Sequence, residues 1–162
     1  MTDPSPDARA LLRHTLATLA YRAAKALRDA PAEFAAYRVA EGSRSPGEIV
    51  AHLGDLMEWG DHMARGEYRW SDSHAGEWSD DVERFFTELG RFDATLAGDA
   101  PLAASLQKLF QGSIADSLTH VGQLTMLRRL YGSPIRGENY SKADITLGRV
   151  GREQAPSRVE FD

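Results

Sequence analysis

Cysteine is absent from the 162 residues of this sequence. Its absence excludes a thiolate nucleophile, a cysteine-bound zinc ion, an iron–sulfur cluster and a disulfide. It also fits a reducing compartment. The length is that of one domain, and a chain of this size buries enough surface to fold without a covalent staple. We therefore expect a single domain over residues 1–162 that draws its chemistry from other side chains.

Long apolar runs and massed basic residues are also missing. No run approaches the ~18 apolar residues of a membrane-spanning helix, and the mean hydropathy is −0.42. Residues 1–7 are acidic and lack the apolar core of a signal peptide. The 19 basic residues are scattered among 24 acidic ones, which argues against nucleic-acid binding. We expect a cytoplasmic protein that contacts neither a membrane nor nucleic acid.

Apolar residues recur at spacings of three and four in four stretches, which is the pattern of amphipathic helices. The expected helices cover about residues 7–29, 46–65, 79–97 and 101–131. Ser5 and Pro6 are a start signal for the first helix. Ser45-Pro46-Gly47-Glu48 is a capping box that opens the second, and Gly66 is its expected stop. Four such helices predict an all-α fold, a four-helix bundle.

The later part of the chain carries weaker signals. Ser79-Asp80-Asp81 places a capping hydroxyl and two acids at the positive end of the third helix. Gln111-Gly112-Ser113 predicts a break in the fourth stretch, between a short lead-in helix and a main helix. Residues 135–162 show no regular pattern but include apolar side chains. We expect them to form an irregular C-terminal extension packed on the same domain.

Three polar residues occupy inward-facing positions of two expected helices. Asp116 and His120 lie one turn and about 40° apart on one helix face, and that face becomes apolar beyond them. His52 lies in the apolar stripe of the second helix, about 20° around the axis from Trp59. Imidazole and carboxylate ligands suit zinc, nickel or another divalent ion. His52, Asp116 and His120 therefore form a candidate metal site.

Such a site would leave coordination positions for water or substrate. The metal could act as a Lewis acid or lower the pKa of a bound water or thiol. Gln123 lies about one turn beyond His120, where it could hydrogen-bond a ligand or a bound molecule. The same residues also fit a simple interpretation. An aspartate and a histidine four residues apart commonly form an ion pair or a hydrogen bond, and a histidine on an apolar face is commonly a core residue.

The other histidines and the tryptophans are weaker candidates. His62 lies more than two turns from His52 on the same expected helix, and His14 is isolated in the first helix. His74 falls in a polar loop, where solvation is the simplest interpretation. The tryptophans, Trp59, Trp70 and Trp78, are interpreted as core or interface residues.

Several segments resemble the DinB family. Ala115–Leu124 is similar to the final-helix motif of that family, and Ser45–Leu53, Arg128–Pro134 and Gly137–Tyr140 are similar to other parts of it. The resemblance implies an up-down-down-up bundle with a divalent metal near one end. It also implies that a histidine of the second helix joins a pair on the last helix.

The ligand positions implied by the resemblance are His52, Asp116 and His120. The sequence departs from many relatives at Asp116, where they have histidine. The mycothiol-dependent maleylpyruvate isomerases have an acid there, but the change could also weaken metal binding. The wider group includes bacillithiol S-transferases. We therefore expect a metal-dependent transferase that activates a low-molecular-weight thiol, which must come from a small molecule because the chain has no cysteine.

Two other functions remain open. One is a non-enzymatic, stress-related or ligand-binding bundle, because no general acid–base pair is evident beyond the candidate ligands. The other is an oligomeric module, because exposed helix faces of a bundle readily pair. We expect a homodimer whichever of the three functions holds.

Overall fold

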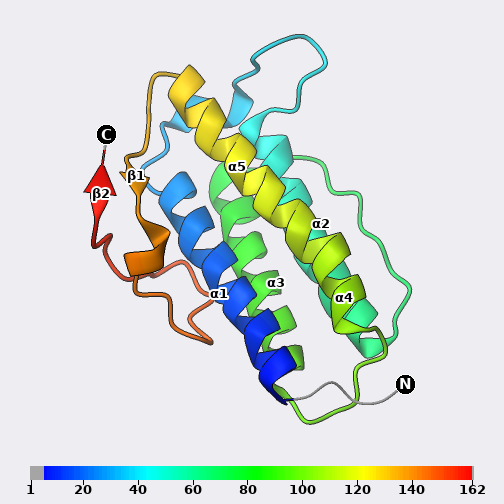
Figure 1. Ribbon diagram of the computed structural model, residues 1–162. Coiled ribbons are helices and arrows are strands. Elements are labelled where there is room, and N and C mark those ends of the chain that lie inside the picture. The colour runs from blue at the N-terminus through cyan, green and yellow to red at the C-terminus, as the bar shows by residue number, and fades with distance from the viewer. Residues whose placement is uncertain (1–5, 162) are drawn as a thin grey trace.

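The computed structural model describes residues 6–161 and shows an all-α four-helix bundle (Figure 1). Its first three helices are α1 (Pro6–Leu27), α2 (Pro46–Arg65) and α3 (Trp78–Ala97). The fourth rod joins α4 (Leu106–Leu109), the π-helical turn η2 (Phe110–Ile114) and α5 (Ala115–Leu130). The shorter elements are η1 (Ala32–Ala36), β1 (Gly137–Glu138), η3 (Tyr140–Lys142) and β2 (Glu160–Phe161). The expected start signal at Ser5 lies outside the described residues.

The helices follow the expected up-down-down-up order (Figure 1). Arg128 near the end of α5 donates to the carbonyl of Ala26 near the end of α1, at 3.1 Å, so these two helices run parallel. Arg9 near the start of α1 donates to the carbonyl of Gly98 after α3, at 2.6 Å, so α1 and α3 run antiparallel. Because α2 and α3 run in the same direction, residues 66–77 must return along the bundle before α3 begins.

The predicted start and stop of α2 are both confirmed. The Ser45 hydroxyl accepts from the backbone N–H of Glu48, and the Glu48 carboxylate accepts from the backbone N–H of Ser45 at 2.7 Å. This reciprocal pair satisfies two donors that the first helical turn leaves free. Gly66 ends the helix with φ of 80°, a left-handed conformation that costs glycine little. The ends of the helix that carries His52 are thus set by local sequence.

The predicted third helix is confirmed to within one residue of its start, with Asp80 and Asp81 in its first turn, but the predicted capping role of Ser79 is wrong. The helix begins at Trp78, and its N-cap residue Glu77 makes no side-chain capping bond. The ring of Trp78 packs edge-on against the fully buried Phe34, with centroids 6.0 Å apart. Phe34 also contacts Tyr131 after α5, at 5.5 Å between centroids. The start of α3 therefore has no capping hydroxyl, and an aromatic contact with a distant segment is found there instead.

The predicted interruption at residues 111–113 is present as the π-helical turn η2 between the short α4 and the longer α5, but the rod continues through it. Gly112 lies against Trp59 of α2, where an added Cβ would come within 3.0 Å of the indole ring. The buried hydroxyl of Ser113 donates to the carbonyl of Leu56 at 2.7 Å. A π-helical turn accommodates these contacts without ending the rod.

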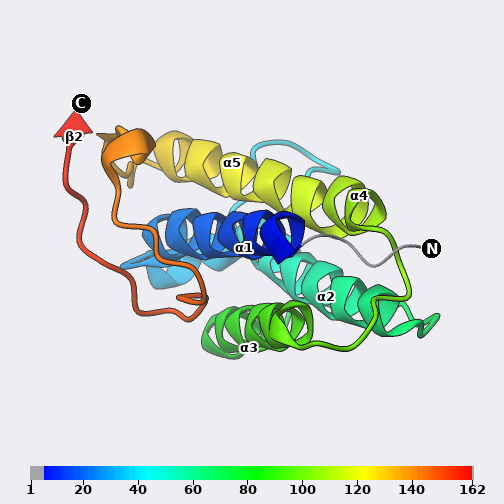
Figure 2. The same ribbon diagram turned by 60° about the horizontal axis from the view of Figure 1, so that its bottom comes forward.

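The C-terminal extension packs along α1, and it is irregular apart from η3 and one short ladder (Figure 2). Its strands pair antiparallel, with Gly137 opposite Phe161. Glu138 accepts hydrogen bonds from Tyr21 at 2.7 Å and from Lys25 at 2.8 Å, both on α1. These bonds fasten the extension to the bundle, as the expected docking requires.

Candidate metal centre

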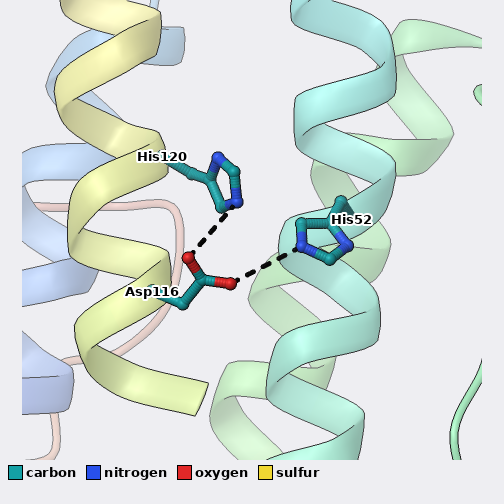
Figure 3. A group of neighbouring side chains, drawn as sticks. All are labelled: His52, Asp116 and His120. Atoms are coloured by element: carbon teal, nitrogen blue, oxygen red, sulfur yellow. Dashed lines mark ion pairs between the residues drawn. The ribbon is translucent and has the colours of Figure 1, made fainter. Parts of the chain in front are cut away.

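α2 and α5 bring the three predicted ligands together (Figure 3). His52 comes from α2, and Asp116 and His120 lie one turn apart on α5. One donor atom from each lies within 4.8 Å of the other two. Donors around a tetrahedral zinc ion are about 3.3 Å apart, given bonds of about 2.0 Å. The group can therefore hold a metal ion after a small inward movement.

The distances do not fit a simple hydrogen-bonded pair. Asp116 Oδ2 lies 3.7 Å from His52 Nε2, and Asp116 Oδ1 lies 3.6 Å from His120 Nε2. Hydrogen bonds between nitrogen and oxygen are about 2.7–3.2 Å long. Within residues 6–161, the Asp116 carboxylate accepts no hydrogen bond at such a distance. It thus faces two imidazoles with the spacing that an intervening cation would bridge.

Gln123 orients His120 toward this space. The Nδ1 atom of His120 lies 2.8 Å from Oε1 of Gln123. Since an amide oxygen only accepts, this contact requires the proton on Nδ1, and in that tautomer Nε2 is the atom that can bind a metal. Nε2 is the atom nearest Asp116. The predicted supporting role of Gln123 therefore has a geometric basis, because ligating histidines are usually held through their second nitrogen.

Burial and charge favour the neutral form of His52. The side chains of His52 and His120 are 17% and 11% exposed, whereas that of Asp116 is 47% exposed. Burial lowers the pKa of His52, and the nearby positive charge of Arg44 lowers it further, against the opposing effect of Asp116 and Asp55. A metal-binding imidazole must be neutral. The two imidazoles thus line the inner side of the site and the carboxylate its mouth.

The π-helical turn sets the direction of the α5 ligands. Asp116 follows η2 by two residues. One extra residue in a helix rotates every later side chain by about 100° relative to the preceding segment. The turn that Gly112 and Ser113 make against α2 therefore determines which face of α5 carries Asp116 and His120. No signal in the sequence marks this bulge beyond the glycine and serine themselves.

The loop after α2 adds a wall that the sequence interpretation missed. Trp70 packs edge-on against His52, with centroids 5.8 Å apart, and against Trp59 at 5.9 Å. An indole at this position shields one side of the His52 ring from water. Because Trp70 lies in an irregular segment, no periodicity relates it to His52, and the sequence alone indicates only a core or interface role.

Two cavities flank the metal site. A polar cavity of about 500 Å³ lies on the His52 side, and a more apolar one of about 490 Å³ lies on the His120 side. Ser43 and Arg44 line both cavities, so the two meet at the segment just before α2. Arg44 is another residue that sequence reasoning missed, since a single basic residue in a loop carries no pattern.

The other histidines lie outside this group. His62 is buried and pairs with Glu67 at 2.6 Å. His14 is exposed on α1. His74 is exposed, as expected for the loop, and lines the polar cavity without joining the three candidate ligands.

Comparison with known proteins adds no relative: no family model, no curated protein and no solved structure matches the chain. The DinB resemblance, the thiol, the homodimer and the cytoplasmic location therefore stay predictions. Across residues 6–161, no helix has both the length and the apolar character needed to cross a membrane.

Proposed function

We propose that this chain is a DinB-like protein that binds a divalent cation through His52, Asp116 and His120. The observation that carries the proposal is the convergence of three donor atoms within 4.8 Å from two different helices. Two imidazoles and one carboxylate suit zinc or nickel, whereas calcium and magnesium prefer sites built from oxygen ligands. Zinc or nickel is therefore the proposed metal.

We further propose that the site activates a low-molecular-weight thiol for transfer to an electrophile. A bound cation supplies Lewis acidity, which lowers the pKa of a thiol that it contacts. The thiol loses its proton, its sulfur forms a bond to an electrophilic carbon, and the leaving group departs with its bonding electrons. Gln123 holds His120 in the ligating tautomer, and Trp70 shields His52 from water. The chain contains no cysteine, so the sulfur belongs to the substrate.

Metal content tests the first part of the proposal. Purified protein is exposed to zinc or nickel, dialysed and measured by elemental analysis beside His52→Ala and His120→Ala. The matched control is His14→Ala, which removes an exposed histidine that is distant in sequence from the three candidate ligands. Wild type and control should retain about one ion per chain, and the two ligand variants well under half of that. Equal retention by all four proteins, each folded by circular dichroism, would contradict the proposed site.

Turnover tests the second part. The metal-loaded protein is mixed with a small thiol and a chromogenic aryl halide, and release of halide is compared with that of Asp116→Ala. Faster release by wild type supports thiol transfer. Stoichiometric metal without turnover across a panel of thiols favours the second candidate, a bundle that binds a small ligand without converting it. The cavity beside His120 is the observation that favours this alternative.

A further inference from the structure

The cavity beside His120 has a mostly apolar lining and one basic side chain, that of Arg44. Besides His120 and Gln123, its lining consists of Ser43, Arg44 and five apolar residues, namely Val39, Ile49, Met126, Leu127 and Leu130. Val39, Met126 and Leu130 are each about half exposed, at 52%, 53% and 53%. Half-exposed apolar side chains gathered around a hollow are typical of a ligand-binding site. The volume of about 490 Å³ suits a small molecule.

Arg44 supplies the charge at the edge of this cavity. It is exposed, and within residues 6–161 its guanidinium makes no hydrogen bond or ion pair. Its neighbour Arg38 differs, because it donates to the Glu48 carboxylate at 2.6 Å. That pairing also neutralises Glu48, one of the three acids, with Asp55 and Asp72, that line the polar cavity with Arg44. Asp55 is paired with Arg84. The charge of Arg44 is therefore available to a ligand.

We propose that this cavity binds an apolar monoanion, with its apolar body against Met126 and Leu130 and its anionic group on Arg44. A guanidinium recognises a carboxylate or sulfonate through two parallel hydrogen bonds. His120 and Gln123 form part of the same lining, so the ligand lies beside the metal group. The inference rests on the proposed function, in which this molecule is the electrophile that receives the thiol.

The test uses 1-octanesulfonate, an apolar anion that coordinates metals weakly, and its uncharged counterpart 1-octanol. Each is titrated into metal-free and zinc-loaded full-length protein that carries ¹³C-labelled methionine methyl groups. The readout is the signal of Met126, which lines the cavity, with the fully buried Met57 as internal reference. We expect a saturable shift of the Met126 signal in both forms and none for Met57.

Charge recognition is tested by Arg44→Gln, with Arg129→Gln as the matched control. Arg129 is exposed on α5 and lies outside the cavity lining. Arg44→Gln should weaken sulfonate binding about ten-fold, as loss of a charged hydrogen bond does, and leave octanol binding unchanged. Arg129→Gln should change neither. Met126→Gln should weaken the binding of both probes.

Three results would overturn the inference. They are equal affinity for the sulfonate and the alcohol, equal effects of the two arginine substitutions, and a dimer that Met126→Lys dissociates in sedimentation velocity. The last result would mean that a second copy of the chain covers this face. Failure of the metal site is a separate outcome. If zinc does not bind but Arg44→Gln still weakens sulfonate binding to metal-free protein, the proposed function fails and the anion site stands.

Discussion

Asp55 accepts two hydrogen bonds from Ser73, one from its backbone N–H at 2.9 Å and one from its hydroxyl at 2.7 Å. The Asp55 carboxylate is almost fully buried, and Arg84 of α3 donates to it as well. Asp55 lies one turn beyond His52 on α2, and Ser73 lies in the loop that carries Trp70. The carboxylate therefore fastens to the bundle the same loop that covers His52.

Substitutions at Asp55 or Ser73 should loosen the loop of residues 66–77 before they unfold the bundle. Ser73→Ala removes the hydroxyl donor and should lower the free energy of unfolding by about 1 kcal/mol. Asp55→Ala should cost about 3 kcal/mol, because it leaves the partly buried Arg84 without its carboxylate. Ser79→Ala is the control, since among residues 6–161 its exposed hydroxyl hydrogen-bonds only to Asp80. Urea unfolding measures the stabilities, and faster amide exchange in residues 66–77 of Ser73→Ala locates the change. Unchanged exchange there would contradict the assigned role.

The contact between His120 and Gln123 predicts a difference between two substitutions. Gln123→Leu removes the acceptor for Nδ1–H and should weaken zinc binding 10- to 100-fold, the usual cost of losing such a partner. Gln123→Glu keeps an acceptor at the same position, so it should retain most of the affinity. Competition with a chromogenic chelator gives both dissociation constants. If the two variants bind zinc equally, Gln123 does not act through His120.

Local sequence determined some parts of the fold and distant packing determined others. The ends of α2 were predictable because the capping box and Gly66 act within one turn of the residues that they fix. The absence of a side-chain cap at α3 was not, because Trp78 packs there on Phe34, 44 positions earlier in the chain. Gly112 predicts an interruption but not its π-helical form, because the contacts of that turn with α2 carry no local signal.

The candidate ligands were predictable for a related reason. Asp116 and His120 share a helix, so their spacing alone places them on one face, and His52 occupies the inward stripe of another helix. Trp70, Asp55 and Arg44 carry no such periodic signal. Their places beside the site depend on where a loop crosses the bundle. The sequence could predict the ligands, but it could not predict the walls and cavities around them.

Close packing at Gly60 predicts that a single methyl group will disturb the site. A Cβ at Gly60 of α2 would lie 2.5 Å from the Ser113 hydroxyl and 2.6 Å from the buried ring of Phe92. Gly60→Ala should therefore push α2 away from η2, cost about 1–3 kcal/mol of stability and weaken zinc binding. Gly122→Ala is the matched control, because nothing lies within 4 Å of a Cβ there.

The control should gain up to about 1 kcal/mol, since alanine favours a helix over glycine, and it should bind zinc normally. Thermal unfolding and chelator competition compare the two proteins. Equal zinc affinities would show that α2 and η2 do not need this close approach to align His52 with Asp116.

Glu138 provides a pH-dependent link between the C-terminal extension and α1. Its side chain is fully buried, and Lys25 bridges it to Glu160 at 2.8 and 2.7 Å. Burial alone would raise the pKa of Glu138, but hydrogen bonds from Lys25, Tyr21 and Ser157 outweigh burial and hold the pKa below its ordinary value. At Lys25, burial alone would lower the pKa, but hydrogen bonds to the carboxylates of Glu138 and Glu160 outweigh burial and raise the pKa.

These directions fix the pH range in which the link stabilises the fold. Because the pKa of Glu138 is lowered in the folded state, its contribution is complete above the ordinary value of about 4.3 and is lost as pH falls through the folded value. The contribution of Lys25 is complete below its ordinary value of about 10.4 and is lost only at higher pH. Both contributions are therefore present near neutral pH, and acid removes that of Glu138 first.

Glu138→Gln should consequently destabilise the protein near neutral pH and matter less in acid. We expect a loss of about 2 kcal/mol near pH 7, below the cost of leaving a buried charge wholly unpaired, because Lys25 keeps Glu160. The difference from wild type should shrink in strong acid, as pH falls through the lowered pKa of Glu138. Urea unfolding near neutral pH and in strong acid measures it, with the exposed Glu153→Gln of the same extension as control. A difference that is constant with pH would mean that Glu138 acts through shape and not through its charge.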